Sequence, residues 1–258
     1  MTSTRWAVVD TETDGLFAPI HVVEIAAQLM QGWNPVGQAF RVLLNHDVPI
    51  PPEVVAVHGY TRSFLREHGL EPRRAHEQFR DYLGDVPLVA HNLSFDWDRC
   101  LEPEWGRLGI APFARRGFCS MLLCRRVIPE TRSHRLSYLK EHFGLAGGQS
   151  HRALNDGTTT VELIRRVLQP KLSSAGLETF EAIARFSRHT PVRKCWEQIH
   201  NKEKQSPREA GAGLRLSPEA EHAPILQRDN EAAVAIGGQA PGHGGGRQRL
   251  RPDDFPRL

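Results

Sequence analysis

Two acidic residues, Asp10 and Glu12, end a short apolar run near the start of the sequence. Residues two positions apart on a β-strand point to the same face, so both carboxylates would lie side by side. Carboxylates placed in this way repel each other, and a divalent cation is the usual compensating charge. The alternative interpretation is a polar turn after a strand, because a D-x-E triplet arises about once by chance in a chain of this length.

A second group of polar residues follows the apolar run PLVA, where the chain would leave a buried strand and enter a helix. His91, Asn92 and Asp96 lie there, at the strand end that commonly binds ligands in α/β sheets. Asp98 is an alternative to Asp96 as the functional acid. Capping of the helix by Ser94 could also explain the segment without any chemical role.

A third pair, His151 and Asp156, lies five positions apart. On a regular helix this spacing separates the two side chains by about 140°. The two side chains can therefore converge only if His151 lies in the loop before the helix. Because the chain contains 13 histidines, the spacing alone is unremarkable, and a structural role is the alternative.

Hydrophobic patterning predicts the elements that would position these side chains. We expect three antiparallel strands at the N-terminus, then helices that alternate with short strands, in an α/β layered fold with a mixed sheet. The expected strands are 6–10, 22–30, 39–44 and 87–90, and the expected helices are 71–83, 94–108, 135–143 and 153–168.

Composition limits the classes of protein to which the chain can belong. Its 258 residues carry a net charge of +3, which is too small to indicate nucleic-acid binding by itself. No apolar run of membrane-spanning length occurs, and the four cysteines lack metal-knuckle spacing, so we expect a cytoplasmic protein with reduced thiols and no membrane partner.

The sequence divides into two parts. We expect residues 1–190 to form the folded domain. Residues 191–258 become rich in glycine and proline and should form a disordered tail. This tail is either a non-functional extension or a tether that ends in a docking peptide around Phe255 and Leu258.

The three polar groups occur in the order D-x-E, H-N-x-x-F-D and H-x4-D, and together they resemble the DEDDh branch of the DnaQ-like 3′–5′ exonucleases, which includes polymerase III epsilon and exonuclease X-type proteins. Residues 51–61, PPEVVAVHGYT, resemble a further element of that family, and residues 135–139 fit as well. The resemblance implies an RNase H-like fold. The chain departs from the family at Asp14, where Thr is frequent, and at Tyr60, where Ile is frequent.

The resemblance also implies a reaction, namely metal-dependent release of nucleoside monophosphates from the 3′ end of DNA in proofreading or repair. Two Mg²⁺ ions, for which Mn²⁺ could substitute, would offset four carboxylates and act as a two-metal site. The implied ligands are Asp10, Glu12, Asp96 and Asp156. His151 would be the general base, so activity should rise with pH near neutrality.

By the same resemblance, four residues would hold the terminal nucleotide: Thr13, His58, Asn92 and Phe95. His58 could instead be a structural histidine and Phe95 a core residue, while His91 should bond to protein rather than to substrate. Three further interpretations remain open: an exoribonuclease, a catalytically silent nucleic-acid-binding scaffold, and association with a DNA polymerase subunit through the tail.

Overall fold

The computed structural model describes residues 4–189, and the statements below concern that part of the chain. The chain divides into two units, residues 1–208 and 209–258, and the second unit lies wholly outside the described residues. The predicted tail and its docking end therefore fall outside the described part as well.

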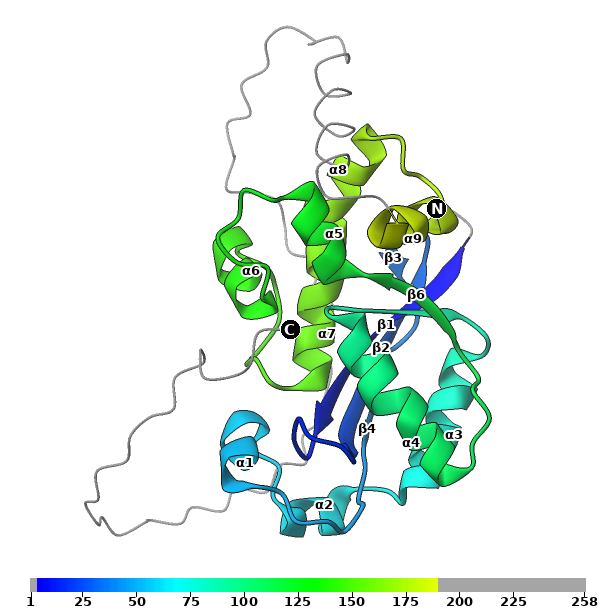
Figure 1. Cartoon of the computed structure of the whole chain (residues 1–258), viewed down its shortest axis with the longest axis vertical. Helices are drawn as coiled ribbons and strands as arrows, with labels where there is room; N and C mark the ends of the chain where they lie inside the picture. The colour runs from blue at the N-terminus through cyan, green and yellow to red at the C-terminus, as the bar shows by residue number, and fades with distance from the viewer. Residues whose placement is uncertain (1–3, 190–258) are drawn as a thin grey trace, which may run out of the picture. The chain divides into compact units, whose positions relative to one another are not determined.

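One mixed sheet organises the described residues (Figure 1). Its strands follow the order β3-β2-β1-β5-β6, and β4 pairs with β2 beside β3. The N-terminal strands pair antiparallel, whereas β5 pairs parallel to both β1 and β6. The predicted mixed sheet with an antiparallel N-terminal portion is therefore confirmed. The strands are β1 (Arg5–Thr13), β2 (Val22–Gln31), β3 (Asn34–Pro35), β4 (Phe40–Leu43), β5 (Pro87–Ala90) and β6 (Arg115–Cys119).

Helices cover both faces of this sheet, and all four predicted helices are present. The helices predicted at 94–108 and 153–168 each combine α-helical and π-helical turns. The bounds are α1 (Pro52–His58), α2 (Arg62–His68), α3 (Pro72–Leu83), η1 (Phe95–Leu101), α4 (Glu102–Leu108), α5 (Ser120–Val127), α6 (Leu136–Phe143), α7 (Ala153–Leu163), η2 (Ile164–Leu168), α8 (Gln169–Ser174) and α9 (Phe180–His189).

Strand β1 divides its side chains between two hydrophobic cores. Trp6 and Val8 pack with α5, α7 and α9 on one face, while Ala7 and Val9 pack with α3, α4 and η1 on the other. Because side chains alternate along a strand, Asp10 continues the face of Trp6 and Val8. The alternation therefore directs the acidic end of β1 toward α7.

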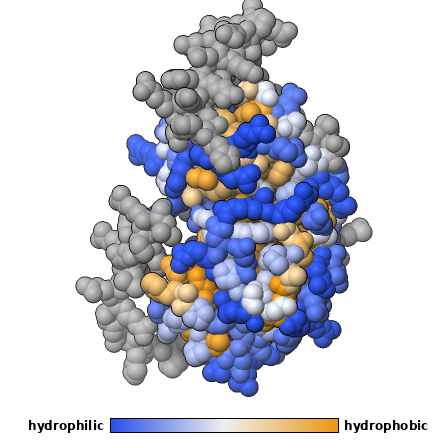
Figure 2. Space-filling model, turned by 45° about the vertical axis from the view of Figure 1, so that its right-hand side comes forward, coloured by the Kyte–Doolittle hydropathy of each residue, from blue (hydrophilic) through white to orange (hydrophobic). Residues whose placement is uncertain are grey.

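The exterior of the described residues mixes polar and apolar groups, and Figure 2 shows the two kinds interspersed on one face. The exposed large apolar side chains include Phe17, Val57 and Phe64. Within residues 4–189, no helix combines the length and the apolar character that crossing a bilayer requires.

Candidate active site

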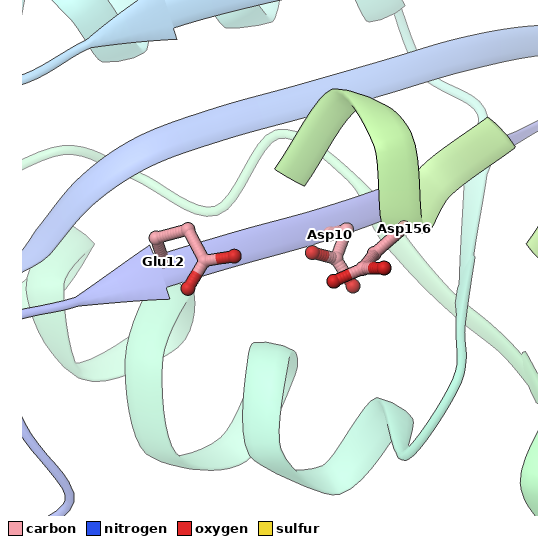
Figure 3. Close-up of side chains that lie close together, drawn as sticks. All are labelled: Asp10, Glu12 and Asp156. Carbon is pink, nitrogen blue, oxygen red and sulfur yellow. The ribbon is translucent and has the colours of Figure 1, made fainter. Parts of the chain in front are cut away.

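Three carboxylates from two elements meet at the end of β1. Asp10 and Glu12 project from the strand, and Asp156 projects from the first turn of α7, which packs against β1 and β2. Each of the three offers an oxygen, and these oxygens all lie within 4.8 Å of one another. In Figure 3, Asp10 and Asp156 face each other and Glu12 lies farther along the same strand. The predicted convergence of residues 146 positions apart in the chain is thus present in the structure.

Asp96 joins this site from the opposite side of β1. It is buried on η1, and the hydroxyl of Thr11 donates to its Oδ1 at 2.8 Å. Its negative charge is among the causes that raise the pKa of Asp10, although Asp96 lies outside the group of three oxygens within 4.8 Å. Asp98, the alternative acid, is exposed and pairs with Arg116. The geometry therefore favours Asp96 over Asp98 as the fourth acid.

The carboxyl groups of the site are hard to ionise. Burial, together with repulsion from Asp96, Asp156 and Glu12, raises the pKa of Asp10 well above its usual range. Burial and neighbouring carboxylates raise the pKa of Glu12 to about 8. Burial also raises the pKa of Asp96 to about 7.

Such a site stores unfavourable charge that a cation would relieve. Its donors are all carboxylate oxygens, and oxygen donors suit hard divalent cations such as Mg²⁺ and Mn²⁺ rather than thiolate-seeking metals. The residues present therefore fit the predicted class of cofactor.

His151 lies in the loop before α7, as the spacing argument required. Its backbone adopts the left-handed conformation with φ of 63°, which is uncommon for residues other than glycine. This turn directs the backbone N–H of His151 to Oδ2 of Asp156 at 2.8 Å. The His151 ring is exposed, and its role as a general base stays a prediction. Strained backbone of this kind is frequent at functional sites.

Thr13 and His58, both predicted to contact substrate, bond to each other. The backbone N–H of Tyr60 donates to Nδ1 of His58, so Nε2 carries the proton and donates to the carbonyl of Thr13 at 3.1 Å. The ring is buried, and burial lowers the pKa of His58. Because both ring nitrogens have protein partners, His58 supports the end of β1, and its contact with substrate stays a prediction.

Asn92 and Phe95 lie where β5 passes into η1. Asn92 has φ of 78°, a conformation that asparagine tolerates better than most residues, and its Oδ1 accepts from Ser94. Ser94 is itself helical and its side chain makes no capping hydrogen bond, so the alternative interpretation of the segment as a helix cap is not supported. Phe95 packs half-buried on the second core beneath the guanidinium of Arg99. Substrate contacts by Asn92 and Phe95 stay predictions.

His91 has a structural environment, as expected. Its Nε2 donates to the carbonyl of His134 at 2.7 Å, and its Nδ1 lies 2.9 Å from the hydroxyl oxygen of Ser120. Burial lowers the pKa of His91 to about 4, so the ring is neutral near pH 7. These contacts hold the start of the β5–η1 turn rather than a ligand.

Sequence reasoning missed a fifth carboxylate, Glu24. It is fully buried on β2, directly opposite Glu12, a placement that is unfavourable for two like charges. Both of its oxygens are used: Oε1 accepts from Nε of Arg41 at 2.6 Å, and Oε2 accepts from the backbone N–H of Ala153 at 3.0 Å. A single acid inside the apolar strand VVEIAAQLM was the signal that could have identified it.

Arg152 is the second residue that the sequence did not single out. Its guanidinium lies over the ring of Tyr60, 4.4 Å from the ring centroid, and donates to the carbonyl of His58. Its positive charge opposes the rise in the pKa of Glu12. Arg152 thereby joins the loop that carries His151 to the turn between α1 and α2.

Comparisons with known proteins agree with this geometry. Residues 7–164 match the family model described as exonuclease (RNase_T), which covers more than half of the chain. The chain belongs to this exonuclease family, and the predicted resemblance to DnaQ-like exonucleases is confirmed. Asp10, Glu12, Asp96, Asp156 and His151 all fall inside the matched segment.

The curated relatives are much longer than the matching region. A protein of Mycobacterium tuberculosis, named as a candidate bifunctional exonuclease/endonuclease, is 30% identical over a 204-residue alignment that covers 74% of this chain and 31% of the relative. The PolC-type DNA polymerase III of Bacillus subtilis is 28% identical over a 172-residue alignment that covers 64% of this chain and 11% of the polymerase. The chain therefore spans less than a third of each of these relatives.

Solved structures support the same fold. Exonuclease X in complex with 5′ overhanging duplex DNA is 26% identical, with a TM-score of 0.53, and the match covers 70% of this chain and 99% of exonuclease X. Exonuclease I of E. coli in complex with a dT13 oligonucleotide has a TM-score of 0.57 at 20% identity, over 66% of this chain and 43% of the exonuclease. The predicted RNase H-like fold is thus confirmed.

Proposed function

We propose that the chain is a metal-dependent 3′–5′ exonuclease that releases nucleoside monophosphates from DNA. The observation that carries the proposal is the meeting of Asp10, Glu12 and Asp156 in one group of oxygens, with Asp96 beside them and His151 in the adjoining loop. A catalytically silent scaffold would have no need of four mutually repelling acids, because buried like charges destabilise a fold unless a ligand compensates them.

Each residue has a distinct task in this proposal. Asp10, Glu12, Asp96 and Asp156 would hold two divalent cations, which lower the pKa of water and offset the charge of the scissile phosphate when bound. His151 would accept a proton at a ring nitrogen from the attacking water. The new bond joins that water oxygen to phosphorus, and the bond from phosphorus to the 3′ oxygen of the preceding nucleotide breaks.

DNA is the proposed substrate because exonuclease X, which is similar over nearly its whole length, is named as a complex with duplex DNA, and because PolC-type polymerases are among the relatives. An exoribonuclease is the alternative, and matched DNA and RNA oligonucleotides distinguish the two. The PolC-type relatives also motivate a role beside a polymerase in replication or repair. The three described cysteines are free and buried, which suits the proposed cytoplasmic location.

The decisive experiment follows a 5′-labelled single-stranded DNA through incubation with the purified chain. We expect a ladder that shortens from the 3′ end with Mg²⁺ or Mn²⁺ and an intact strand with EDTA. Asp10→Asn should abolish the ladder, whereas Asp98→Asn, on the surface pair with Arg116, should leave it unchanged. An intact strand under all conditions would favour the scaffold, and shortening from the labelled end would reverse the proposed polarity.

A further inference from the structure

The first turn of α7 carries Asp156 and follows His151, yet it does not depend on helix packing alone for its place. Side chains from β2, from β4, from the turn between α1 and α2 and from the residue directly before α7 surround its start. We name these four side chains the α7 frame: Glu24, Arg41, Tyr60 and Arg152.

The first half of the α7 frame is a buried ion pair that reaches the backbone. Glu24 is completely buried, and its two oxygens divide between Arg41 on β4 and the N–H of Ala153, the first residue of α7. An N–H in the first turn of a helix has no partner within the helix, so this carboxylate supplies one. Hydrogen bonds to a charged acceptor are stronger than neutral ones, so Glu24 fixes where α7 begins.

The second half of the α7 frame is an aromatic contact. Tyr60 is buried, its hydroxyl accepts from Nη2 of Arg41 at 3.0 Å, and its ring lies beneath the guanidinium of Arg152. Arg152 and Ala153 are adjacent in the chain, so the contacts form a closed circuit from β2 through β4 and back to α7.

The α7 frame lies next to the proposed catalytic residues, but its side chains are not among the proposed metal ligands or the proposed base. Glu24 is directly across the strand from Glu12, and Arg152 immediately follows His151. Because both oxygens of Glu24 already accept from protein donors, this carboxylate is committed to holding α7.

We propose that the α7 frame is a positioning device that holds His151 and Asp156 in register with the carboxylates of β1, an inference that rests on the proposed nuclease function. Displacement of a catalytic group by about 1 Å can cost on the order of 100-fold in rate. The α7 frame therefore controls turnover, whereas substrate affinity depends on other groups.

The test compares Tyr60→Leu, Arg152→Met and the double variant with the wild-type full chain, using kcat and KM on labelled DNA. We expect each single variant to lower kcat on the order of 10- to 100-fold with KM within about threefold of the wild-type value. The double variant should lose no more than the worse single variant, because the two side chains act as one contact. Tyr60→Phe keeps the ring beneath Arg152 but loses the hydroxyl that accepts from Arg41, so its kcat should lie between those of the wild type and Tyr60→Leu.

A second readout does not depend on activity. Amide hydrogen exchange followed by NMR should become faster at Ala153 and at its neighbours in the first turn of α7 in Tyr60→Leu, with the exchange of β1 amides unchanged. Glu24→Gln, which keeps an oxygen acceptor for Ala153, should exchange more slowly there than Glu24→Ala. Arg62→Ala, which removes an exposed ion pair with Asp47 outside the α7 frame, should match the wild-type chain in both assays.

The outcomes separate the two proposals. If the wild-type chain degrades DNA and both single variants keep its kcat, the α7 frame is not a positioning device. If KM rises at constant kcat in Arg152→Met, Arg152 binds substrate and the positioning role is also overturned. If the wild-type chain does not degrade DNA, the proposed function fails, and unchanged exchange in the first turn of α7 would then reject the α7 frame as well.

Discussion

Asp156 does two things with one side chain. Its carboxylate faces the oxygens of Asp10 and Glu12 and also accepts the backbone N–H of His151. That hydrogen bond opposes the rise in the pKa of Asp156 that burial causes. The conformation of the loop that carries His151 therefore depends on Asp156. The proposed base, His151, and the proposed cation ligand, Asp156, are held in place by the same hydrogen bond.

The proposed base can be tested directly. Replacement of His151 by alanine removes a proton acceptor but leaves the carboxylates in place, so we expect kcat to fall by on the order of 10²–10⁴. Metal affinity, measured by titration with Mn²⁺, should stay within about threefold of wild type, since the carboxylate ligands are unchanged. His142→Ala, an exposed histidine on α6, is the matched control. Wild-type turnover in His151→Ala would remove this residue from the mechanism.

The pKa values of the acids predict how the stability of the metal-free chain depends on pH. Burial raises the pKa of Glu12 to about 8 and that of Asp96 to about 7, whereas the unfolded chain releases these protons near pH 4. Between pH 6.5 and 8 the folded state therefore holds more protons than the unfolded state, and the free energy of unfolding falls as pH rises. His58 and His91, whose folded pKa values are lowered, act in the opposite sense, but their effect fades as pH rises above the unfolded value of about 6.5.

We therefore expect the Tm in EDTA to fall as pH rises through this window, and Mg²⁺ to raise the Tm more at its upper end, because the cation binds the ionised carboxylates. Thermal unfolding at a series of pH values measures both effects. Glu12→Gln should show a shallower fall. A Tm in EDTA that is constant or rises between pH 6.5 and 8 would contradict the raised pKa values.

At the scale of elements, the site depends on how closely β5 and β6 pair, because β5 leads into η1 and Asp96. Gly117 on β6 has no room for a side chain: an added Cβ would lie 2.6 Å from the carbonyl oxygen of Leu88 and 3.0 Å from Phe180. We expect Gly117→Ala to lower the free energy of unfolding by about 1–3 kcal/mol, the usual cost of overpacking.

Gly106 is the matched control for this prediction. It is exposed within α4, and an added Cβ there would meet nothing within 4 Å. Gly106→Ala should raise the free energy of unfolding by about 0.5–1 kcal/mol, because alanine favours a helix. Urea denaturation of both variants measures the difference, and equal stabilities would show that β6 tolerates the extra carbon.

The elements also show where sequence reasoning succeeds and where it stops. Strand alternation predicted that Asp10 and Glu12 share one face, and helix geometry predicted that His151 lies in the loop if it meets Asp156. Their assignment to one site came from the family resemblance. Strands β3 and β6 and helices α1, α2, α5, α8 and α9 were not predicted, and of these α1, α2, β3 and β6 are too short to show a period. The roles of Glu24 and Arg152 depend on partners far apart in the sequence, and local patterns carry no information on such contacts.

At the scale of the whole molecule, similar proteins contain the nuclease unit either as a small part of a long chain or as nearly the whole chain. It is 11% of the PolC-type polymerase of Bacillus subtilis but matches 99% of the exonuclease X chain that is named as a DNA complex. In this chain, both hydrophobic cores are built from residues between Trp6 and Phe186, and the candidate site lies within the same limits. Nothing in the described part requires residues after 208 to complete the core or the site.

We therefore expect a chain that ends at Arg208, the last residue of the first unit, to degrade DNA with kcat within about twofold of the full chain, because the cores and the site remain intact. If residues 209–258 recruit a polymerase subunit, only the full chain should retain that subunit in a pull-down with purified polymerase. Loss of nuclease activity at equal folded protein would instead place part of the substrate site in the second unit. Equal capture by both chains would move any polymerase contact onto the nuclease unit.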